Sequence, residues 1–230
     1  MKIVVLAGGL SPERNVSLST GTMVTEALRA LGHRAGLIDL YFGLETGGAD
    51  EAFFDAPVSE AYKKISREAP DLDQVRRGRK GDSPSMFGPG VLELCRMADM
   101  VFLALHGTCG EDGRVQAAFD LMGIPYTGAG YLGSAIAMDK DLTKRMVADV
   151  VSTPGWKTVA YTAADIDRLV ETARLPLVVK PVASGSSIGV SIAHTAEELR
   201  RSLTEGLALG GRTVLEEYIR GREIQVGILE

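Results

Sequence analysis

The opening of the chain alternates short apolar runs with a segment of helical periodicity. Ile3–Ala7 is a continuous apolar run followed by a glycine pair, a pattern typical of a buried parallel strand that enters a loop. The next segment predicts a helix that stops at Gly32, because its apolar residues recur at helical spacing: Val24, Ala27, Leu28 and Leu31. Ala35–Leu40 predicts a second strand, so the chain opens as a βαβ unit with a parallel sheet.

The pattern weakens between Tyr41 and Pro89, where glycines and prolines interrupt it. We interpret this segment as a surface insertion. It carries a basic cluster, which we interpret as a solvated loop rather than a phosphate site: Arg76, Arg77, Arg79 and Lys80. Periodicity returns with a predicted helix over Val91–Ala98 and a predicted strand over Met100–Leu105.

The middle of the chain contains a glycine-rich loop, His106–Gly113, directly after that strand. A helix is predicted after the loop from apolar residues at helical spacing: Val115, Ala118, Phe119 and Met122. Gly123–Gly130 predicts a domain junction, because the pattern changes beyond it. A single long helix is predicted from about Leu132 to Ala148.

The second half predicts an α+β arrangement. Strands are predicted over Trp156–Ala160, Leu177–Lys180, Val190–Ala193, Val214–Ile219 and Ile224–Ile228. Two capping boxes, Thr162 with Asp165 and Thr195 with Glu198, predict helix starts between these strands. Only a short loop separates the last two strands, which predicts an antiparallel hairpin rather than a continued parallel sheet.

Composition narrows the functional classes. The chain has 25 Lys and Arg against 30 Asp and Glu, a net charge of -5, which argues against a binder of nucleic acid or of anionic membranes. With 45% hydrophobic residues among 230, a sizeable core is expected, and no apolar run approaches the roughly 20 residues of a membrane span. The two cysteines, Cys95 and Cys109, are interpreted as reduced thiols of a cytoplasmic protein.

Several familiar motifs are absent. Gly185–Gly189 matches the G-x-S-x-G nucleophile elbow, but a strand rather than a helix follows it, and no Asp occurs after Ser187. The chain has no Walker loop, and Gly8-Gly9 does not extend to a dinucleotide fingerprint. The three histidines lack zinc spacing. Glycine and serine residues near Lys180 remain, and from chemistry alone this loop is either an anion-binding lid or an ordinary glycine-rich turn.

Six motifs resemble, in the same order along the chain, those of the D-alanine–D-alanine ligase family. They are Gly8–Ser17, His106–Gly113 (HGxxGEDG), Tyr126–Gly128 with Met138–Lys140, Val179–Pro181 with Gly185–Gly189, Leu215–Ile219, and Gly221–Glu223. The resemblance implies an ATP-grasp architecture: an α/β fold with a parallel-sheet N-terminal domain, a small α+β central domain and the start of a third domain. The implied boundaries are 1–128, 129–220 and 221–230.

The resemblance also implies roles for residues of the N-terminal half. Glu13 matches the glutamate that binds the ammonium group of the first D-alanine, and Ser186 matches the serine hydrogen-bonded to it; both are expected at the catalytic centre. From the residues alone, Glu13 is equally a helix-dipole acid behind an N-cap Ser11 and an N1 Pro12. His106 is either a structural histidine or, by resemblance, a contact of the substrate carboxylate, with Glu111 bracing its loop.

The nucleotide-binding residues are carried over in the same way. Lys140 and Lys180 match the two phosphate-binding lysines, although isolated lysines are usually surface charges. Ser186 and Ser187 belong to the loop that covers the phosphates. The adenine edge is expected to meet Glu216 with the backbone of Glu217 and Ile219, and the ribose to meet Glu223.

The implied reaction joins two D-alanines with ATP through an acyl phosphate, for peptidoglycan precursors and hence cell shape. A D-alanine–D-lactate or D-alanine–D-serine ligase is the nearest alternative. The family's magnesium (or manganese) ligands and substrate lid have no counterpart before residue 230, so no metal ligand is assigned, and the chain alone is expected to be a non-catalytic fragment. The expected partners are D-alanine and ATP, with a homodimer through the N-terminal domain as a further possibility.

Overall fold

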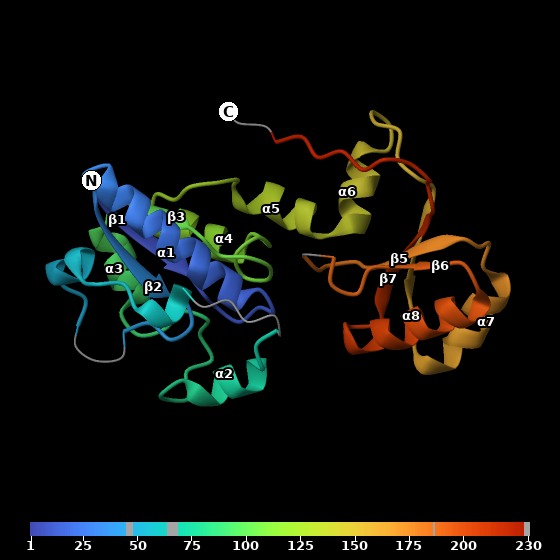
Figure 1. Cartoon of the computed structure of the whole chain (residues 1–230), viewed down its shortest axis with the longest axis horizontal. Coiled ribbons are helices and arrows are strands. Elements are labelled where there is room, and N and C mark those ends of the chain that lie inside the picture. The colour runs from blue at the N-terminus through green and yellow to red at the C-terminus, as the bar shows by residue number, and fades with distance from the viewer. Residues whose placement is uncertain (45–47, 64–68, 186, 228–230) are drawn as a thin grey trace. The chain divides into compact units, whose positions relative to one another are not determined.

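A computed structural model describes residues 1–44, 48–63, 69–185 and 187–227. The chain divides into two compact units, Met1–Met138 and Asp139–Glu230, called here the N-terminal and C-terminal units. The subdomain boundary predicted at residues 128–129 lies before the last helix of the N-terminal unit. Figure 1 shows the elements of each unit. Within the described ranges, no helix is both long and apolar enough to cross a membrane.

The N-terminal unit is built on a parallel sheet, as the βαβ pattern predicts. Its strands are β1 (Lys2–Ala7), β2 (Arg34–Asp39) and β3 (Met100–Leu103), in the order β2-β1-β3. Both β2 and β3 run parallel to β1. The third strand is shorter than predicted, since β3 ends at Leu103 rather than Leu105.

Helices cover both faces of this sheet. The helices are α1 (Arg14–Ala30), α3 (Val91–Met97) and α4 (Arg114–Met122). Because successive strand residues point to opposite faces, Ile3 and Val5 pack with α1, whereas Val4 and Leu6 pack with α3 and α4. The continuous apolar run of β1 therefore follows from burial on both sides.

The predicted apolar face of α1 is confirmed only in part. Val24 and Leu28 pack against the core, but Leu31 is 74% exposed and Ala27 is also exposed. Small residues instead face the sheet: Ser17, Gly21, Thr22 and Thr25. A Cβ atom at Gly21 would lie 2.7 Å from Leu37 and 2.8 Å from Ala7, so the helix lies too close to the strands for large side chains. The apolar pattern therefore missed the closest contacts of α1, because close packing against the sheet selects small residues.

The segment between Tyr41 and Pro89 is only partly a surface insertion. Its described elements are the short 3-10 helices η1 (Glu51–Asp55) and η2 (Glu60–Lys63) and helix α2 (Leu72–Gly78). Phe54 has no exposed surface and belongs to the core beside α3 and α4. Arg79 is buried and donates to the carbonyl oxygens of Ser85 and Phe87, so the predicted solvated basic cluster is wrong for this residue.

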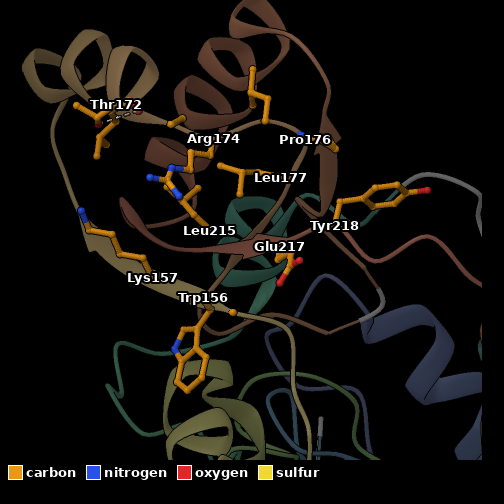
Figure 2. A pocket seen from close by; sticks show the side chains of 13 residues that line it. Trp156, Lys157, Thr172, Arg174, Pro176, Leu177, Leu215, Glu217 and Tyr218 are labelled. Atoms are coloured by element: carbon orange, nitrogen blue, oxygen red, sulfur yellow. Dashed lines mark hydrogen bonds between the residues drawn. The ribbon is translucent and has the colours of Figure 1, made fainter.

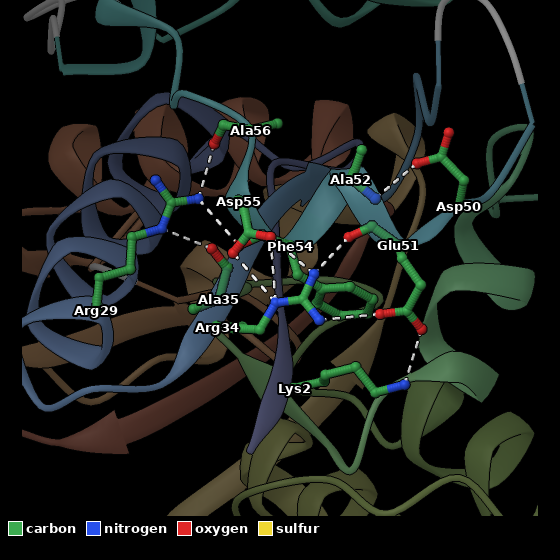
Figure 3. Close-up of polar contacts among 10 residues, drawn as sticks. All are labelled: Lys2, Arg29, Arg34, Ala35, Asp50, Glu51, Ala52, Phe54, Asp55 and Ala56. Carbon is green, nitrogen blue, oxygen red and sulfur yellow. Dashed lines mark hydrogen bonds and ion pairs between the residues drawn. The ribbon is translucent and has the colours of Figure 1, made fainter.

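A network of charged side chains fastens η1 to the sheet (Figure 3). The Arg34 guanidinium contacts Asp55 Oδ2 at 2.7 Å and Glu51 Oε2 at 3.1 Å, and Lys2 Nζ contacts Glu51 Oε1 at 2.9 Å. Arg29 donates to the carbonyl oxygen of Ala56 at 2.7 Å. The network lies at the surface, and two of its cations also lie over the buried Phe54 ring, with Lys2 Nζ at 5.8 Å and Arg34 Cζ at 5.9 Å from the ring centre.

The predicted long helix from Leu132 to Ala148 is two helices. Helix α5 covers Tyr131–Met138 and α6 covers Lys140–Val147. Asp139 separates them in an extended conformation, and its carboxylate accepts a hydrogen bond from Leu142 N at 3.0 Å. This N-cap begins a new helix, which is why the periodicity alone did not indicate the break.

The C-terminal unit contains an antiparallel sheet. Its strands are β4 (Trp156–Ala160), β5 (Leu177–Pro181), β6 (Ser191–Ala193) and β7 (Arg212–Glu217), in the order β4-β7-β5-β6. All of their pairings are antiparallel. The 3-10 turn η3 (Ala163–Asp165), α7 (Ile166–Thr172) and α8 (Ala196–Ala208) follow the two predicted capping boxes, both of which are confirmed. The fold class predicted for this half is therefore correct.

Helices α7 and α8 pack on one face of that sheet, where Leu199 and Leu203 are fully buried against Val179 and Leu215. The predicted hairpin with Ile224–Ile228 is wrong for its described part. Residues 224–227 form no strand, and Val226 is 80% exposed. Strand β7 instead lies between β4 and β5, so it has no free edge.

Candidate functional site

One face of the C-terminal sheet, opposite α7 and α8, opens into a cavity of about 440 Å³ that we call the lysine cavity. Alternate residues of β5 and β7 face it, because side chains alternate along a strand. Its lining comes from α6, β5, the following loop, β6 and the segment after β7: Lys140, Pro154, Val178, Lys180, Ser184, Gly185, Ser187, Val190, Ile192, Glu216, Tyr218, Ile219 and Glu223. The structure thus brings together most of the predicted nucleotide-binding residues.

Glu216 lies at the centre of the charges in this cavity. Its carboxylate contacts Lys180 Nζ at 2.6 Å and Lys144 Nζ at 2.9 Å, and the side chain is only 8% exposed. Burial by itself would raise the pKa of Glu216, but hydrogen bonds from Lys180 and Lys144 outweigh it and lower the pKa. The carboxylate is therefore a fixed anion that holds two ammonium groups in position.

Lys140 adds a further positive charge. Its Nζ donates to the carbonyl oxygen of Ser184 at 2.8 Å, and its backbone N–H donates to Val182 O at 2.9 Å. Burial and the nearby charge of Lys180 lower the pKa of Lys140, although Asp139 opposes the shift. Two lysines share the Glu216 carboxylate and Lys140 lies nearby, so this cluster has an excess of positive charge that an anion would neutralise.

The glycine/serine loop closes one side of the lysine cavity. Ser184 Oγ donates to Ile188 O at 3.1 Å, and Val190 N donates to Ser187 O at 3.1 Å, so the loop is fastened to itself. Ser187 has a φ of 57° and Gly189 a φ of 72°, which are conformations suited to close backbone approach. Ser186, the predicted catalytic serine, lies outside the described residues.

The segment after β7 divides its side chains between two faces. Ile219 and Glu223, which the family resemblance assigns to the adenine and the ribose, line the lysine cavity. The Glu217 side chain does not line it; its backbone N–H donates to Gly155 O at 2.8 Å. Only the backbone of Glu217, not its side chain, could therefore contact a ligand in the lysine cavity.

Lys144 was not identified from the sequence. It is 8% exposed, and besides Glu216 its Nζ donates to Thr153 Oγ1 at 2.6 Å. A signal existed, because Lys144 follows Lys140 by four residues and therefore shares its helix face.

The N-terminal unit assembles Glu13, His106 and Glu111 from two loops. Ser11 Oγ donates to His106 O at 2.7 Å and accepts from Glu13 N at 3.1 Å. Gly107 has a φ of 71°, and a Cβ atom there would lie 2.7 Å from Glu13 Oε2. This glycine therefore allows the Glu13 carboxylate to lie against the second loop.

His106 and Glu111 line a cavity of about 350 Å³ in this unit. His106 Nε2 lies 3.3 Å from Thr20 Oγ1, and His106 Nδ1 lies 3.9 Å from Glu111 Oε1. The other Glu111 oxygen accepts from Gly107 N at 2.7 Å. Glu111 thus braces the loop, as the sequence predicts.

The start of α1 differs from the predicted capping arrangement. Ser11 and Pro12 are not its N-cap and N1 residues; Glu13 is the N-cap, and its side chain makes no capping hydrogen bond. Ser11 instead ties the two loops together through its hydroxyl. The Glu13 carboxylate is therefore not used to cap the helix.

Arg14 is a second residue that the sequence did not single out. Its guanidinium is buried, forms an ion pair with Asp39 at the end of β2, and donates to Gly9 O at 2.8 Å. It also lies 4.7 Å from the centre of the Phe42 ring. Arg14 therefore fixes the loop that carries Glu13.

The structure shows no candidate metal site among the described residues. No group of three or more His, Cys, Asp or Glu side chains lies close enough together to hold an ion. Cys95 and Cys109 are free, buried thiols. Burial raises the pKa of Cys95 to about 12, so it is not a reactive nucleophile.

Comparisons with known proteins agree with the motif order. Residues 2–129 match the family model described as D-ala D-ala ligase N-terminus, and residues 149–230 match D-ala D-ala ligase C-terminus. D-alanine--D-alanine ligases of Lacticaseibacillus casei and Pediococcus pentosaceus are 40% and 41% identical over 232 residues. These alignments cover all of this chain and 64% and 66% of the two relatives. The chain thus spans somewhat less than two thirds of their length.

Solved structures give the same result for the fold. A D-alanine–D-alanine ligase from Bacillus anthracis, complexed with ATP, is 27% identical with a TM-score of 0.62, and one from Coxiella burnetii is 28% identical with a TM-score of 0.64. Each match covers 96% of this chain, and 60% and 64% of those chains respectively. The architecture is that of part of an ATP-grasp protein. The chain belongs to the D-alanine–D-alanine ligase family.

Proposed function

We propose that this chain provides the nucleotide-binding and first-substrate parts of an ATP-dependent D-alanine–D-alanine ligase. The observation that carries the proposal is the lysine cavity, which Lys140 and Lys180 line and in which Lys180 shares the carboxylate of Glu216 with the buried Lys144. An excess of ammonium groups beside a glycine/serine loop suits a polyphosphate, whose charge would otherwise be costly to bury. Membership in the family and the ATP complex of a related ligase support the same nucleotide.

The proposed reaction uses ATP because a carboxylate is a poor electrophile. A carboxylate oxygen of the first D-alanine attacks the γ-phosphorus, the bond to the bridging oxygen breaks, and ADP leaves with an acyl phosphate remaining. The amine of the second D-alanine then attacks the acyl carbon, loses a proton and expels inorganic phosphate. The repulsion between the anionic reactants makes positive charge at the phosphates the main requirement.

In this proposal Lys140 and Lys180 bind the phosphates, and the loop with Ser186 and Ser187 covers them. Glu216, with the backbone of Glu217 and Ile219, meets the adenine edge, and Glu223 binds the ribose hydroxyls. Because its carboxylate already holds two lysines, Glu216 would meet the base from a fixed position. Glu216 therefore also acts as a positioning residue for Lys180.

The amino-acid side of the proposal rests on the N-terminal unit. Glu13 binds the ammonium group of the first D-alanine, with Ser186 as its hydrogen-bond partner. His106 approaches the substrate carboxylate, and Glu111 holds the His106 loop through Gly107 N. The buried Arg14–Asp39 pair keeps the Glu13 loop in place.

Further parts of the proposal follow from the family. The enzyme acts in the cytoplasm on peptidoglycan precursors, uses Mg²⁺ or Mn²⁺, and forms a homodimer through the N-terminal unit. The described residues supply no cluster of metal ligands, so no step is assigned to a metal here. D-lactate and D-serine are the alternative second substrates.

The test is the assay of the complete gene product that carries this chain. We expect phosphate release from ATP to require D-alanine and to match the D-alanyl-D-alanine formed. D-lactate and D-serine, added in place of excess D-alanine, identify the second substrate. No phosphate release with ATP, Mg²⁺ and D-alanine would contradict the proposal.

A further inference from the structure

A second and larger cavity lies on the other face of the same sheet. Its volume is about 620 Å³, and we call it the back pocket (Figure 2). It is lined by residues at the starts of β4 and β5, the end of α7 and the end of β7: Gly155, Trp156, Lys157, Leu169, Thr172, Ala173, Arg174, Leu175, Pro176, Leu177, Leu215, Glu217 and Tyr218. None of the proposed roles above uses this pocket.

The two cavities lie back to back across β5 and β7. Leu177 and Leu215 line the back pocket, whereas their neighbours Val178 and Glu216 line the lysine cavity. This division follows from the alternation of side chains along a strand. Tyr218 lines both cavities. The back pocket is therefore separate from the proposed nucleotide site but lies behind the strand that forms it.

The back pocket combines an apolar wall with the positively charged guanidinium of Arg174. Leu169, Leu177 and Leu215 provide hydrocarbon surface. Figure 2 shows the Arg174 side chain directed toward Leu177 and Leu215, with Glu217 at the other end of the pocket. Among the described residues, Arg174 has no ion-pair or hydrogen-bond partner for its guanidinium. A guanidinium beside leucines suits a carboxylate that carries an apolar group.

Charge distribution fixes the orientation of such a ligand. Lys157 adds a second cation to the lining, whereas Glu217 would repel a carboxylate from the end where it approaches Gly155. The volume lies within the range of roughly 300–1,000 Å³ that small-molecule sites occupy. The lysine cavity differs, because its charges are engaged with one another and with the backbone.

We propose that the back pocket binds a compact apolar carboxylate, with its carboxylate on Arg174 and its hydrocarbon part on the three leucines. A short arylalkyl carboxylate represents this class. The proposal does not depend on the ligase reaction, because it concerns a different face of the sheet. It assigns this unit a second binding site.

Isothermal titration calorimetry measures binding to the pocket. Trp156 fluorescence does not serve for this, because the indole points away from the pocket (Figure 2) and its Nε1 donates to Asp141 Oδ1 at 3.0 Å. The probes are 4-phenylbutyrate, 4-phenylbutanol and 4-phenylbutylamine, which differ mainly in the charge of one end. We expect saturable binding with the carboxylate strongest and the amine weakest. Ligand-observed NMR saturation transfer measures the same binding by a second method.

Three variants sharpen the test. Arg174→Leu should weaken 4-phenylbutyrate binding about tenfold, since a charge-assisted contact is lost, and should leave 4-phenylbutanol nearly unchanged. Gly155→Leu should weaken all three probes by occupying the mouth of the pocket, where an added Cβ would meet only Glu217 Oε2 at 3.7 Å. Arg201→Leu is the matched control, because Arg201 is exposed on α8 and does not line the pocket.

Urea midpoints for each variant establish that the C-terminal unit remains folded. The proposal is overturned if no probe binds by either measurement, or if the carboxylate and the amine bind equally well. An equal loss of 4-phenylbutyrate binding in Arg174→Leu and Arg201→Leu would also overturn it. Because no nucleotide is needed, these results do not depend on the outcome of the ligase assay.

Discussion

Each unit contains one cluster of charged side chains around a buried carboxylate, and the two clusters differ in their balance of charge. In the N-terminal unit Arg14 pairs with Asp39, and both side chains are almost fully buried. The Asp39 carboxylate also accepts from the backbone N–H groups of Tyr41 and Phe42. The pair has one positive and one negative charge, and both terminal nitrogens of the Arg14 guanidinium donate to the Asp39 carboxylate. This pair is complete without a ligand and holds two loops together.

The charged cluster around Glu216 in the C-terminal unit has more positive than negative groups. Lys144 and Lys180 share the Glu216 carboxylate, and the nearby Lys140 Nζ donates to the carbonyl oxygen of Ser184. Like charges so close together are held at a cost in free energy. The comparison teaches that a balanced buried cluster indicates a structural role, whereas an excess of one charge indicates the site of an oppositely charged ligand.

The largest effect is expected from the balanced pair. Asp39→Asn keeps the shape of the side chain but leaves the buried Arg14 guanidinium without a counter-charge. We expect the free energy of unfolding of the N-terminal unit to fall by about 4 kcal/mol, measured by urea denaturation. The control is Asp167→Asn, since Asp167 pairs with Arg200 at the surface and is 75% exposed. A loss no larger than that of the control would show that the pair is not structural.

The cluster of Glu216 with Lys144 and Lys180 should respond differently when its carboxylate is likewise replaced by an amide. Glu216→Gln leaves Lys144 and Lys180 unneutralised, and we expect the C-terminal unit to lose about 3 kcal/mol of stability. Inorganic tripolyphosphate should restore part of this loss, because it supplies the missing negative charge. It should not restore Asp39→Asn. Equal rescue of both variants in thermal unfolding would contradict the distinction between the two clusters.

A third buried carboxylate, Asp141, allows a test by pH. It accepts from Thr158 Oγ1 at 2.7 Å, from Trp156 Nε1 at 3.0 Å and from Arg145 Nε at 3.0 Å. Hydrogen bonds from Thr158 and Trp156 lower the pKa of Asp141 from 3.8 to about 2. Because the folded-state pKa is the lower one, the stabilisation is present above pH 3.8 and disappears as the pH falls toward 2.

The corresponding variant is Asp141→Asn. At pH 6 we expect it to lower the free energy of unfolding by about 2 kcal/mol, and near pH 2 the difference from the unchanged chain should become small. Urea denaturation at several pH values measures this. Asp82→Asn, at an exposed position, should show no such trend. A difference that stays constant from pH 6 to pH 2 would exclude ionisation as the cause.

The smallest effect is expected from the surface network of Figure 3. Arg34 lowers the pKa values of Asp55 and Glu51 through hydrogen bonds, together with Lys2 for Glu51, but all of these groups lie in water. Arg34→Gln should therefore reduce stability less than any change above, and about 1 M salt should remove the difference. A large loss that persists in salt would show that η1 is held by this network rather than by Phe54.

The sequence predicted the elements better than their packing. β1 and both capping boxes depend on local patterns, and the structure confirms them. The small residues on the buried face of α1 could not be predicted, because they are selected by the distance to the sheet. The two helices around Asp139 were predicted as one, since a capping aspartate does not interrupt apolar periodicity.

The residues of the candidate site were also predicted only where a local motif contained them. The motifs indicated Lys140, Lys180 and Glu216, which the structure brings to one cavity. Lys144 and Arg14 were missed because their partners, Glu216 and Asp39, are distant in sequence. Pairings of this kind depend on the tertiary fold, and no local pattern reports them.

The central claim is that the excess positive charge binds the phosphates of ATP while the N-terminal loops bind D-alanine. Steady-state kinetics of the complete gene product test it most directly, with Lys180→Ala and Glu13→Gln compared at varied ATP and varied D-alanine. We predict that Lys180→Ala mainly raises the KM for ATP and that Glu13→Gln mainly raises the KM for D-alanine. Indistinguishable kinetic profiles for the two variants would contradict the account.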